Sequence, residues 1–151
     1  IFNIPSLLAS SWLKIQPKTR IVGFCEPLVQ FHELSQKDNG SRITISFANG
    51  FSIIAISRWN KLLHCGSIES HTIDDTLYHM VNICKQLDLT PAETHVSTMG
   101  YVEQAENMDA LIERFFKGVS IATTLEQNHF SYLLVKYKGR FANLFNQSLC
   151  E

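Results

Sequence analysis

The alternation of polar and apolar residues over Arg42–Phe47 is the feature that most limits how this chain can fold. A period of two places the apolar side chains on one face of a β-strand. A second run, Phe51–Ser57, follows Asn49 and Gly50, and an Asn-Gly pair readily adopts positive φ at both positions of a tight turn. The two runs are therefore predicted to form an antiparallel hairpin. Lys61–Ile68 is predicted as a third strand, which completes a meander.

Helical periodicity replaces the strand pattern after residue 70. Apolar residues from Ile73 to Leu87 recur as one stripe, with Thr72 as the N-cap and Asp75 as the acid of a capping box. This predicts a helix that ends before Thr90-Pro91. The remaining predicted elements are helices over Leu7–Ile15, from Pro27, over Val102–Phe115 and over Phe130–Leu144, and strands over Arg20–Phe24, Thr94–Thr98 and Val119–Ala122.

Composition excludes several classes of protein. The chain has 151 residues, 45% of them hydrophobic, and 13 basic against 14 acidic side chains, so no surplus of positive charge is present to hold nucleic acid. No apolar run approaches the roughly 20 residues of a membrane-spanning helix. The four cysteines are scattered without a C-x-x-C pair, which favours reduced thiols in a cytoplasmic protein. Because the chain begins at Ile1 and shows no signal-peptide pattern, we expect its start to be a processed or cut end.

The order of elements from Arg42 onward is three meandering strands followed by helix, strand, helix, strand and helix. This order resembles the ribonuclease H-like layout that forms each half of actin-type ATPases. More specifically, the chain resembles an uncharacterised bacterial family with an actin-like ATPase fold. The segments that carry this resemblance are Asn60–Leu63, Ile73–Tyr78, Gln86–Pro91, Met99–Tyr101 and the closing Leu149–Glu151. We therefore expect an α/β fold in which the antiparallel meander is continued by parallel strands, with helices on both faces.

The resemblance also implies a domain organisation and a candidate site. Residues 42–151 would form one ribonuclease H-like half, and residues 1–41 would connect it to a preceding half across a cleft. In the wider superfamily the first hairpin carries a phosphate loop with an aspartate and a glycine. Here that position holds Asn49 and Gly50 and no aspartate, so a plain hairpin turn is the favoured interpretation and a phosphate contact the alternative. Gly100 lies where the superfamily has its adenosine-side glycines, although a helix start explains it as well.

No other cluster of residues predicts a catalytic or metal site. The six histidines lack the spacing that directs two imidazoles at one metal ion. Asp74 and Asp75 fall in a first helical turn, where carboxylates complement the helix dipole. His64 and Cys65 are neighbours on a predicted strand, so they point to opposite faces and form no dyad.

Two functions follow as hypotheses. The favoured one is a cytoplasmic, non-catalytic scaffold or adaptor with a degenerate nucleotide site, which needs no cofactor and binds a protein partner or the missing half-domain. The alternative is an ATPase or small-molecule kinase in which Asn49, Gly50 and Gly100 contact Mg-ATP and the other half supplies the catalytic acid. A nuclease is disfavoured because the strand Arg42–Phe47 has no carboxylate to hold metal ions.

Overall fold

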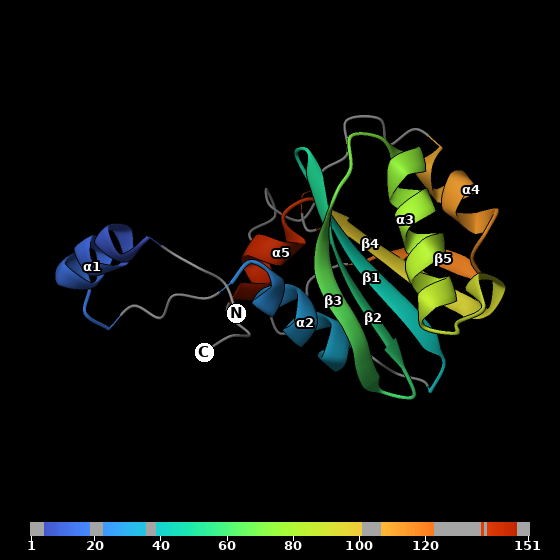
Figure 1. Cartoon of the computed structure of the whole chain (residues 1–151), viewed down its shortest axis with the longest axis horizontal. Helices are drawn as coiled ribbons and strands as arrows, with labels where there is room; N and C mark the ends of the chain where they lie inside the picture. Colours follow the sequence, from blue (N-terminus) through green and yellow to red (C-terminus); the bar gives the residue numbers. More distant parts are fainter. Residues whose placement is uncertain are drawn as a thin grey trace.

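A computed structural model of the chain describes residues 5–18, 23–35, 39–100, 107–122, 137 and 139–147. It is a mixed α/β structure in which helices cover both faces of one five-stranded sheet (Figure 1). The elements are α1 (Ser6–Ile15), α2 (Cys25–Leu34), β1 (Ser41–Ala48), β2 (Phe51–Arg58), β3 (Lys61–Glu69), α3 (Ile73–Gln86), the 3₁₀ turn η1 (Pro91–Glu93), β4 (Thr94–Gly100), α4 (Met108–Glu113), β5 (Gly118–Ile121) and α5 (Ala142–Phe145).

The strand order is β3-β2-β1-β4-β5. β1 pairs antiparallel with β2, and β2 pairs antiparallel with β3. On its other edge β1 pairs in parallel with β4, which in turn pairs in parallel with β5. The predicted meander and its continuation by parallel strands are thus both confirmed, and β1 is the strand at which the two pairing modes meet.

Each face of the sheet buries its own cluster of side chains. On the face covered by α3 and α4, which we call the α3 face, Ile54 and Ile56 pack with Met80 and Ile112. On the opposite face, covered by α2 and α5 and called the α2 face, the intervening residues of β2 pack with helical residues; this second cluster comprises Ile53, Ala55, Leu28, Phe31, Met99, Ala122 and Ala142. Because consecutive residues of a strand point to opposite sides, one strand serves both cores.

The two hairpin turns differ from the prediction in an instructive way. At the β1–β2 turn φ is positive at Gly50 (79°) but not at Asn49, so positive φ at both positions was wrong. Only the second position of this turn takes a positive φ, and glycine adopts that conformation at little cost. The β2–β3 turn instead has positive φ at both Trp59 (52°) and Asn60 (57°), which is the backbone pattern of a type I′ hairpin.

The start of α3 confirms the predicted capping box. The Thr72 Oγ1 accepts a hydrogen bond from the Asp75 N–H at 3.1 Å, and the Thr72 N–H donates to Asp75 Oδ2 at 3.1 Å. These bonds satisfy two backbone N–H groups at the N-terminus of the helix, those of Thr72 and Asp75. Hydrogen bonding with Thr72, through its side chain first and its backbone second, lowers the pKa of the exposed Asp75 carboxyl.

Other elements shift at their ends. Helix α2 begins at Cys25, before the predicted start at Pro27, because a proline in the first turn sacrifices no intrahelical hydrogen bond. Helix α4 ends at Glu113, before Phe115, and Gly118 begins β5. Residues 20–22 of the predicted strand, residues 102–106 of the predicted helix over Val102–Phe115 and most of the predicted helix over Phe130–Leu144 lie outside the described residues. The described end of the predicted strand, Gly23 and Phe24, forms no strand. In the last predicted helix, residues 139–141 form a turn and only residues 142–144 belong to a helix, α5.

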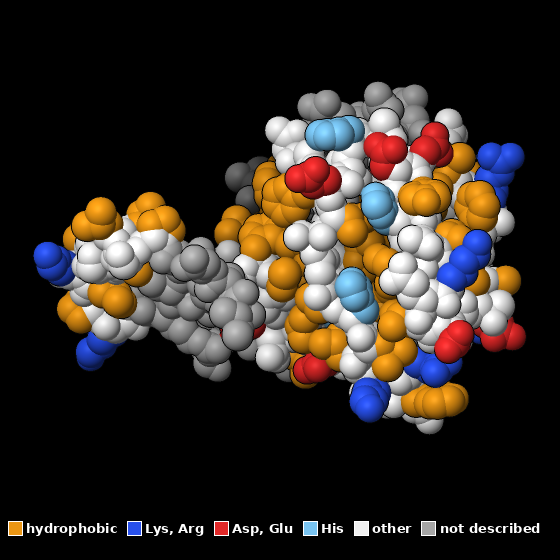
Figure 2. Space-filling model, viewed as in Figure 1, with side chains coloured by type: hydrophobic (Ala, Val, Ile, Leu, Met, Phe, Trp, Pro, Cys, Tyr) orange, Lys and Arg blue, Asp and Glu red, His pale blue; other side chains and the backbone are white. Residues whose placement is uncertain are grey.

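Helix α1 buries none of its residues and stands apart from the sheet in Figure 1. Apolar side chains are visible over its surface in the space-filling view (Figure 2). Trp12 is 54% exposed and Ile15 is 76% exposed. The helix predicted from Leu7 to Ile15 is therefore present, and its apolar side chains are available for contact.

Candidate functional site

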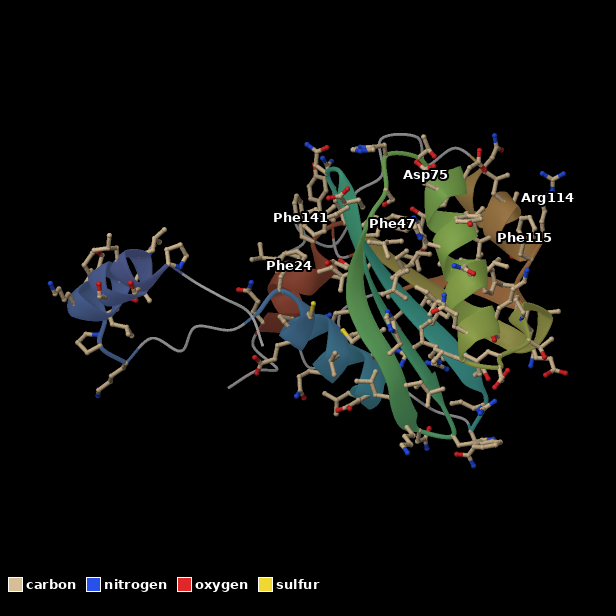
Figure 3. The ribbon with its side chains drawn as sticks, in the orientation of Figure 1. Phe24, Phe47, Asp75, Arg114, Phe115 and Phe141 are labelled. Carbon is tan, nitrogen blue, oxygen red and sulfur yellow. The ribbon has the colours of Figure 1, made fainter. Side chains whose placement is uncertain are left out.

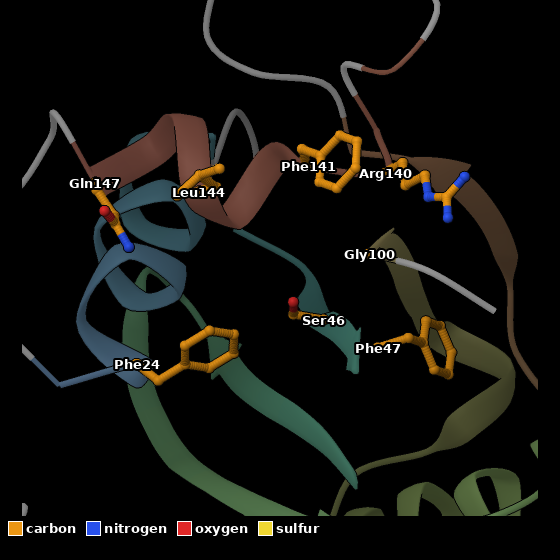
Figure 4. A pocket seen from close by; sticks show the side chains of 8 residues that line it. All are labelled: Phe24, Ser46, Phe47, Gly100, Arg140, Phe141, Leu144 and Gln147. Atoms are coloured by element: carbon orange, nitrogen blue, oxygen red, sulfur yellow. The ribbon is translucent and has the colours of Figure 1, made fainter. Parts of the chain in front are cut away.

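A small cavity lies where the carboxyl ends of β1 and β4 come together. Its volume is about 140 Å³, and its lining residues are Phe24, Ser46, Phe47, Gly100, Arg140, Phe141, Leu144 and Gln147 (Figure 4). In open α/β sheets, ligands bind beyond the carboxyl ends of the strands, next to the strand where the direction of chain connection changes. β1 is such a strand here, so this cavity is the candidate site.

The walls of the cavity are mainly aromatic and aliphatic. Phe24, Phe47 and Phe141 lie toward the same end of the sheet in Figure 3. Phe24 also packs against Phe51 with ring centroids 6.0 Å apart. Three of the wall residues face solvent in part, with Phe24 51%, Phe141 43% and Leu144 57% exposed. These three side chains form what we call the apolar rim.

Polar side chains in the cavity are few. Ser46 is buried on β1, whereas Gln147 is exposed. The guanidinium carbon of Arg140 lies 5.5 Å from the centroid of the Phe141 ring, so the cation lies within cation–π range of the apolar rim. The cavity therefore offers a single positive charge among the residues that line it.

Gly100 has a structural reason to be glycine. Its φ is +95°, and a Cβ built at this position would lie 2.2 Å from the carbonyl oxygen of Phe47. Its N–H donates to the carbonyl oxygen of Gly139 at 3.0 Å, which brings Arg140 and Phe141 to the cavity. Gly100 thus permits the close approach of β4 to β1 and anchors the segment before α5.

The structure separates the three residues predicted for a nucleotide site. Gly100 lines the cavity, whereas Asn49 and Gly50 form the β1–β2 turn and are not among its lining residues. A Cβ built at Gly50 would meet no atom within 4 Å, so this turn borders open space. Contact of these residues with a nucleotide stays a prediction.

Sequence reasoning missed most of the lining residues. Phe24 precedes α2, and Arg140 to Gln147 come from the last described segment, so the cavity joins parts of the chain more than a hundred positions apart. The apolar period that includes Phe141 and Leu144 predicts a helix but does not tell which residues border a cavity. Gly100 was the one lining residue singled out in the sequence. The structure shows that its positive φ and its close contact with Phe47 place it on the cavity wall.

Apart from the cavity, one ionisable side chain, His32, lies fully buried on the α2 face. Its Nδ1 is 2.7 Å from Thr44 Oγ1. Burial, reinforced by the nearby positive charge of Arg42, lowers the pKa of His32 to about 4. Nε2 of His32 and the side-chain amide of Asn146 are buried without a hydrogen-bond partner among the described residues. His32 is therefore neutral in the folded protein near neutral pH.

Within the described ranges, no three His, Cys, Asp or Glu side chains come together as a metal site requires. Nor does any helix in the described part of the chain have the length and apolar character to cross a bilayer.

A protein family matches the chain over residues 1–119 of its 151. The chain belongs to the family described as "Protein of unknown function (DUF3822)". No curated protein matches it. Among solved structures, this family member is similar to a Bacteroides thetaiotaomicron protein with an actin-like ATPase fold and unknown function, at 17% identity and a TM-score of 0.77.

This structural match covers 98% of the DUF3822 chain but 52% of the Bacteroides chain, so the present chain spans about half the length of the protein it matches. At 17% identity the likeness shows the fold alone. It confirms the expected resemblance to a half of an actin-like ATPase fold, and the function has to be argued from the cavity and its surroundings.

Proposed function

We propose that this domain is a non-catalytic scaffold or adaptor with a degenerate nucleotide site, and that it binds a second half-domain through the apolar rim. The observation that carries this proposal is the combination of a very small cavity with three exposed apolar side chains around it, Phe24, Phe141 and Leu144. Burying such a surface against another protein is favourable in free energy, whereas a charged nucleotide would find few polar partners on it.

The size of the cavity supports the proposal. Pockets that enclose drug-sized ligands measure roughly 300–1,000 Å³, against about 140 Å³ here. The main polar group on its walls is the Arg140 guanidinium, which lies beside the Phe141 ring. A nucleotide would find little enclosed volume for its base and ribose.

The first hairpin supports it as well. Ala48 is paired with Phe51, so the turn consists of Asn49 and Gly50 alone and leaves no longer loop to surround a phosphate. Asn49 cannot supply the negative charge that would orient a metal ion, because its side chain is a neutral amide. This part of the molecule is built as a tight turn.

The proposed occupant is a half-domain of the same architecture. The Bacteroides protein is nearly twice as long as the part matched here, so its structure contains an additional region of similar length. Helix α1, whose Trp12 and Ile15 are exposed, offers a second apolar surface for the same partner. In this proposal the protein works in the cytoplasm, a reducing compartment in which permanent structural disulfides are rare; Cys25, Cys65 and Cys84 are free thiols.

Hydrogen exchange tests this function. We would compare this chain with the complete encoded protein, including whatever precedes Ile1. The expected result is slower exchange in the complete protein at residues 139–147 and in α1, with unchanged exchange in α3. A Leu144→Asp variant should lose that protection, whereas Tyr78→Asp, on the exposed surface of α3, should keep it. Equal exchange at the rim in both proteins would contradict the proposal.

The alternative function, an ATPase or small-molecule kinase, is favoured by one observation: the cavity lies beyond the carboxyl ends of parallel strands and contains Arg140 and Gly100. Calorimetric titration with MgATP separates the two functions. The scaffold predicts no saturable heat from the folded complete protein. Saturable binding that weakens in both Asn49→Ala and Arg140→Ala would instead support the nucleotide site.

A further inference from the structure

Two thiols that are distant in sequence meet on the α2 face. Cys25 is the first residue of α2, and Cys65 lies in the middle of β3. Both are free and half-buried, and both pack against the same apolar cluster, which includes Leu28 and Ala55. The two residues thus come from elements that the fold packs against each other.

A β-bulge is what turns Cys65 toward α2. Ser57 pairs with Leu62 while the next residue back along β2, Ile56, pairs with His64, so β3 holds one extra residue at this point. Leu62 and Cys65 are three positions apart and would point to opposite faces in a regular strand. With the extra residue both pack on the α2 face.

The α2 side of the pair is equally well defined. Cys25 precedes the fully buried Leu28 by three positions, so the two side chains share one face of the helix. That face is directed at the sheet, where Leu28 packs with Ala55. Ala55 is the cross-strand partner of Cys65, which places the two cysteines over neighbouring positions of the sheet.

The two thiols interact directly. The pKa of Cys65 is raised to about 12, first by burial, then by the adjoining charge of Cys25 and by a hydrogen bond between the two side chains. Cys65 therefore keeps its proton at neutral pH, and a protonated thiol reacts slowly with an oxidant. Since both side chains also pack against the same apolar cluster, the two thiols share one part of the α2 face.

We infer that Cys25 and Cys65 form a redox pair, which closes to an intramolecular disulfide when a hydroperoxide oxidises the protein and reopens with a thiol reductant. The inference is independent of the proposed scaffold function, because it needs only the packing of α2 on β3.

The chemistry balances with the hydroperoxide as the oxidant. Cys25 sulfur attacks one peroxide oxygen and breaks the O–O bond, giving a sulfenic acid and one molecule of water or alcohol. Cys65 sulfur then attacks the Cys25 sulfur, the S–O bond breaks, and the departing hydroxide leaves as water with the Cys65 proton. One S–S bond is formed, the two cysteines lose two electrons, and the peroxide gains them.

The disulfide would fix the first turn of α2 on β3. Phe24, which precedes Cys25, lines the cavity and contacts Phe51, so the crosslink would also hold one wall of the candidate site. The closed loop runs from residue 25 to residue 65, and a loop of this length should raise Tm by roughly 8–16 °C.

The test uses the whole chain and its four cysteines. The protein is treated with hydrogen peroxide, the remaining thiols are alkylated, and proteolytic peptides are identified by mass spectrometry. The expected result is a crosslinked peptide pair containing Cys25 and Cys65, the loss of two free thiols, a higher Tm and complete reversal by dithiothreitol.

Three variants serve as controls. Cys25→Ser and Cys65→Ser should each melt like the reduced native chain and show no rise in Tm with peroxide, while Cys84→Ser, altered on the α3 face, should still form the crosslink. The inference is overturned by a crosslink that uses Cys150, by Cys25 carried to sulfinic acid while Cys65 stays free, or by unchanged thiols in folded protein.

Discussion

The two faces of the sheet are built on different principles, although they share the same strands. On β1 the isoleucines Ile43 and Ile45 point to the α3 face and belong to its closed apolar core. The residue between them, Thr44, points to the α2 face, where it contacts the buried His32. The α3 face is therefore a core in the ordinary sense, whereas the α2 face combines apolar packing with buried polar groups and ends in an exposed rim. We infer that packing on the α3 face contributes most to the stability of the fold, whereas the α2 face carries the candidate binding surface.

Truncating matched isoleucines gives the strongest test of this comparison. Ile54 and Ile53 are neighbours on β2, both at most 1% exposed, and point to the α3 and α2 faces respectively. Ile54→Ala should lower the free energy of unfolding by about 4 kcal/mol and Ile53→Ala by about 3 kcal/mol, because Ile53 pairs with Ser46 beside a cavity that can relax around the change. Urea denaturation measures both. Equal losses would break the distinction between the faces.

Glycine substitutions sharpen the comparison at the cavity. Gly100→Ala should cost about 3 kcal/mol, since the new methyl group would collide with the Phe47 carbonyl in a backbone of positive φ. Gly50→Ala is the matched control. It has a similar φ but open space around it, so the expected loss is about 1 kcal/mol. The same denaturation assay applies, and a smaller loss at Gly100 than at Gly50 would contradict the close strand contact.

The buried histidine should make the α2 face sensitive to acid. The pKa of His32 is about 4 in the folded protein against an ordinary value of 6.5, so below 6.5 the unfolded chain binds a proton that the folded protein does not. Stability present above pH 6.5 is therefore lost as the pH falls toward 4, by roughly 2 kcal/mol by the middle of that interval.

Urea denaturation across this pH range checks the effect. His32→Gln should flatten this part of the pH profile. A profile that is the same in the native chain and in His32→Gln would show that another group is responsible.

The smallest expected effect is at the helix cap on the α3 face. Thr72→Ala removes the hydroxyl that accepts from the Asp75 N–H and should cost about 1 kcal/mol. Thr72→Ser keeps the acceptor and should cost less. Thermal unfolding of the two variants gives the comparison, and equal melting temperatures would argue that the cap contributes little.

How much could be predicted from the sequence differs between these same regions. The meander and α3 were predictable because their signals are local: alternation over Arg42–Phe47, an apolar stripe from Ile73, and a cap at Thr72. The likeness in element order also anticipated the actin-like fold.

The candidate site was not predictable in the same way. Phe24 and Phe141 meet only because the chain returns to the same end of the sheet, and no local pattern records that return. The orientation of Cys65 depends on one extra residue in β3, and the sequence pattern of that strand does not predict the bulge. Even at the Asn49-Gly50 turn, the dipeptide indicated a turn and not its backbone type.

The position of β1 between an antiparallel and a parallel neighbour also has a consequence for how the chain folds. Its pairing with β2 closes across a two-residue turn, and such hairpins form in microseconds. Its pairing with β4 brings together residues that are separated in sequence by β2, β3 and α3, and such long-range contacts form more slowly. During synthesis the meander can therefore assemble first, with one edge of β1 unoccupied until β4 emerges and completes the sheet.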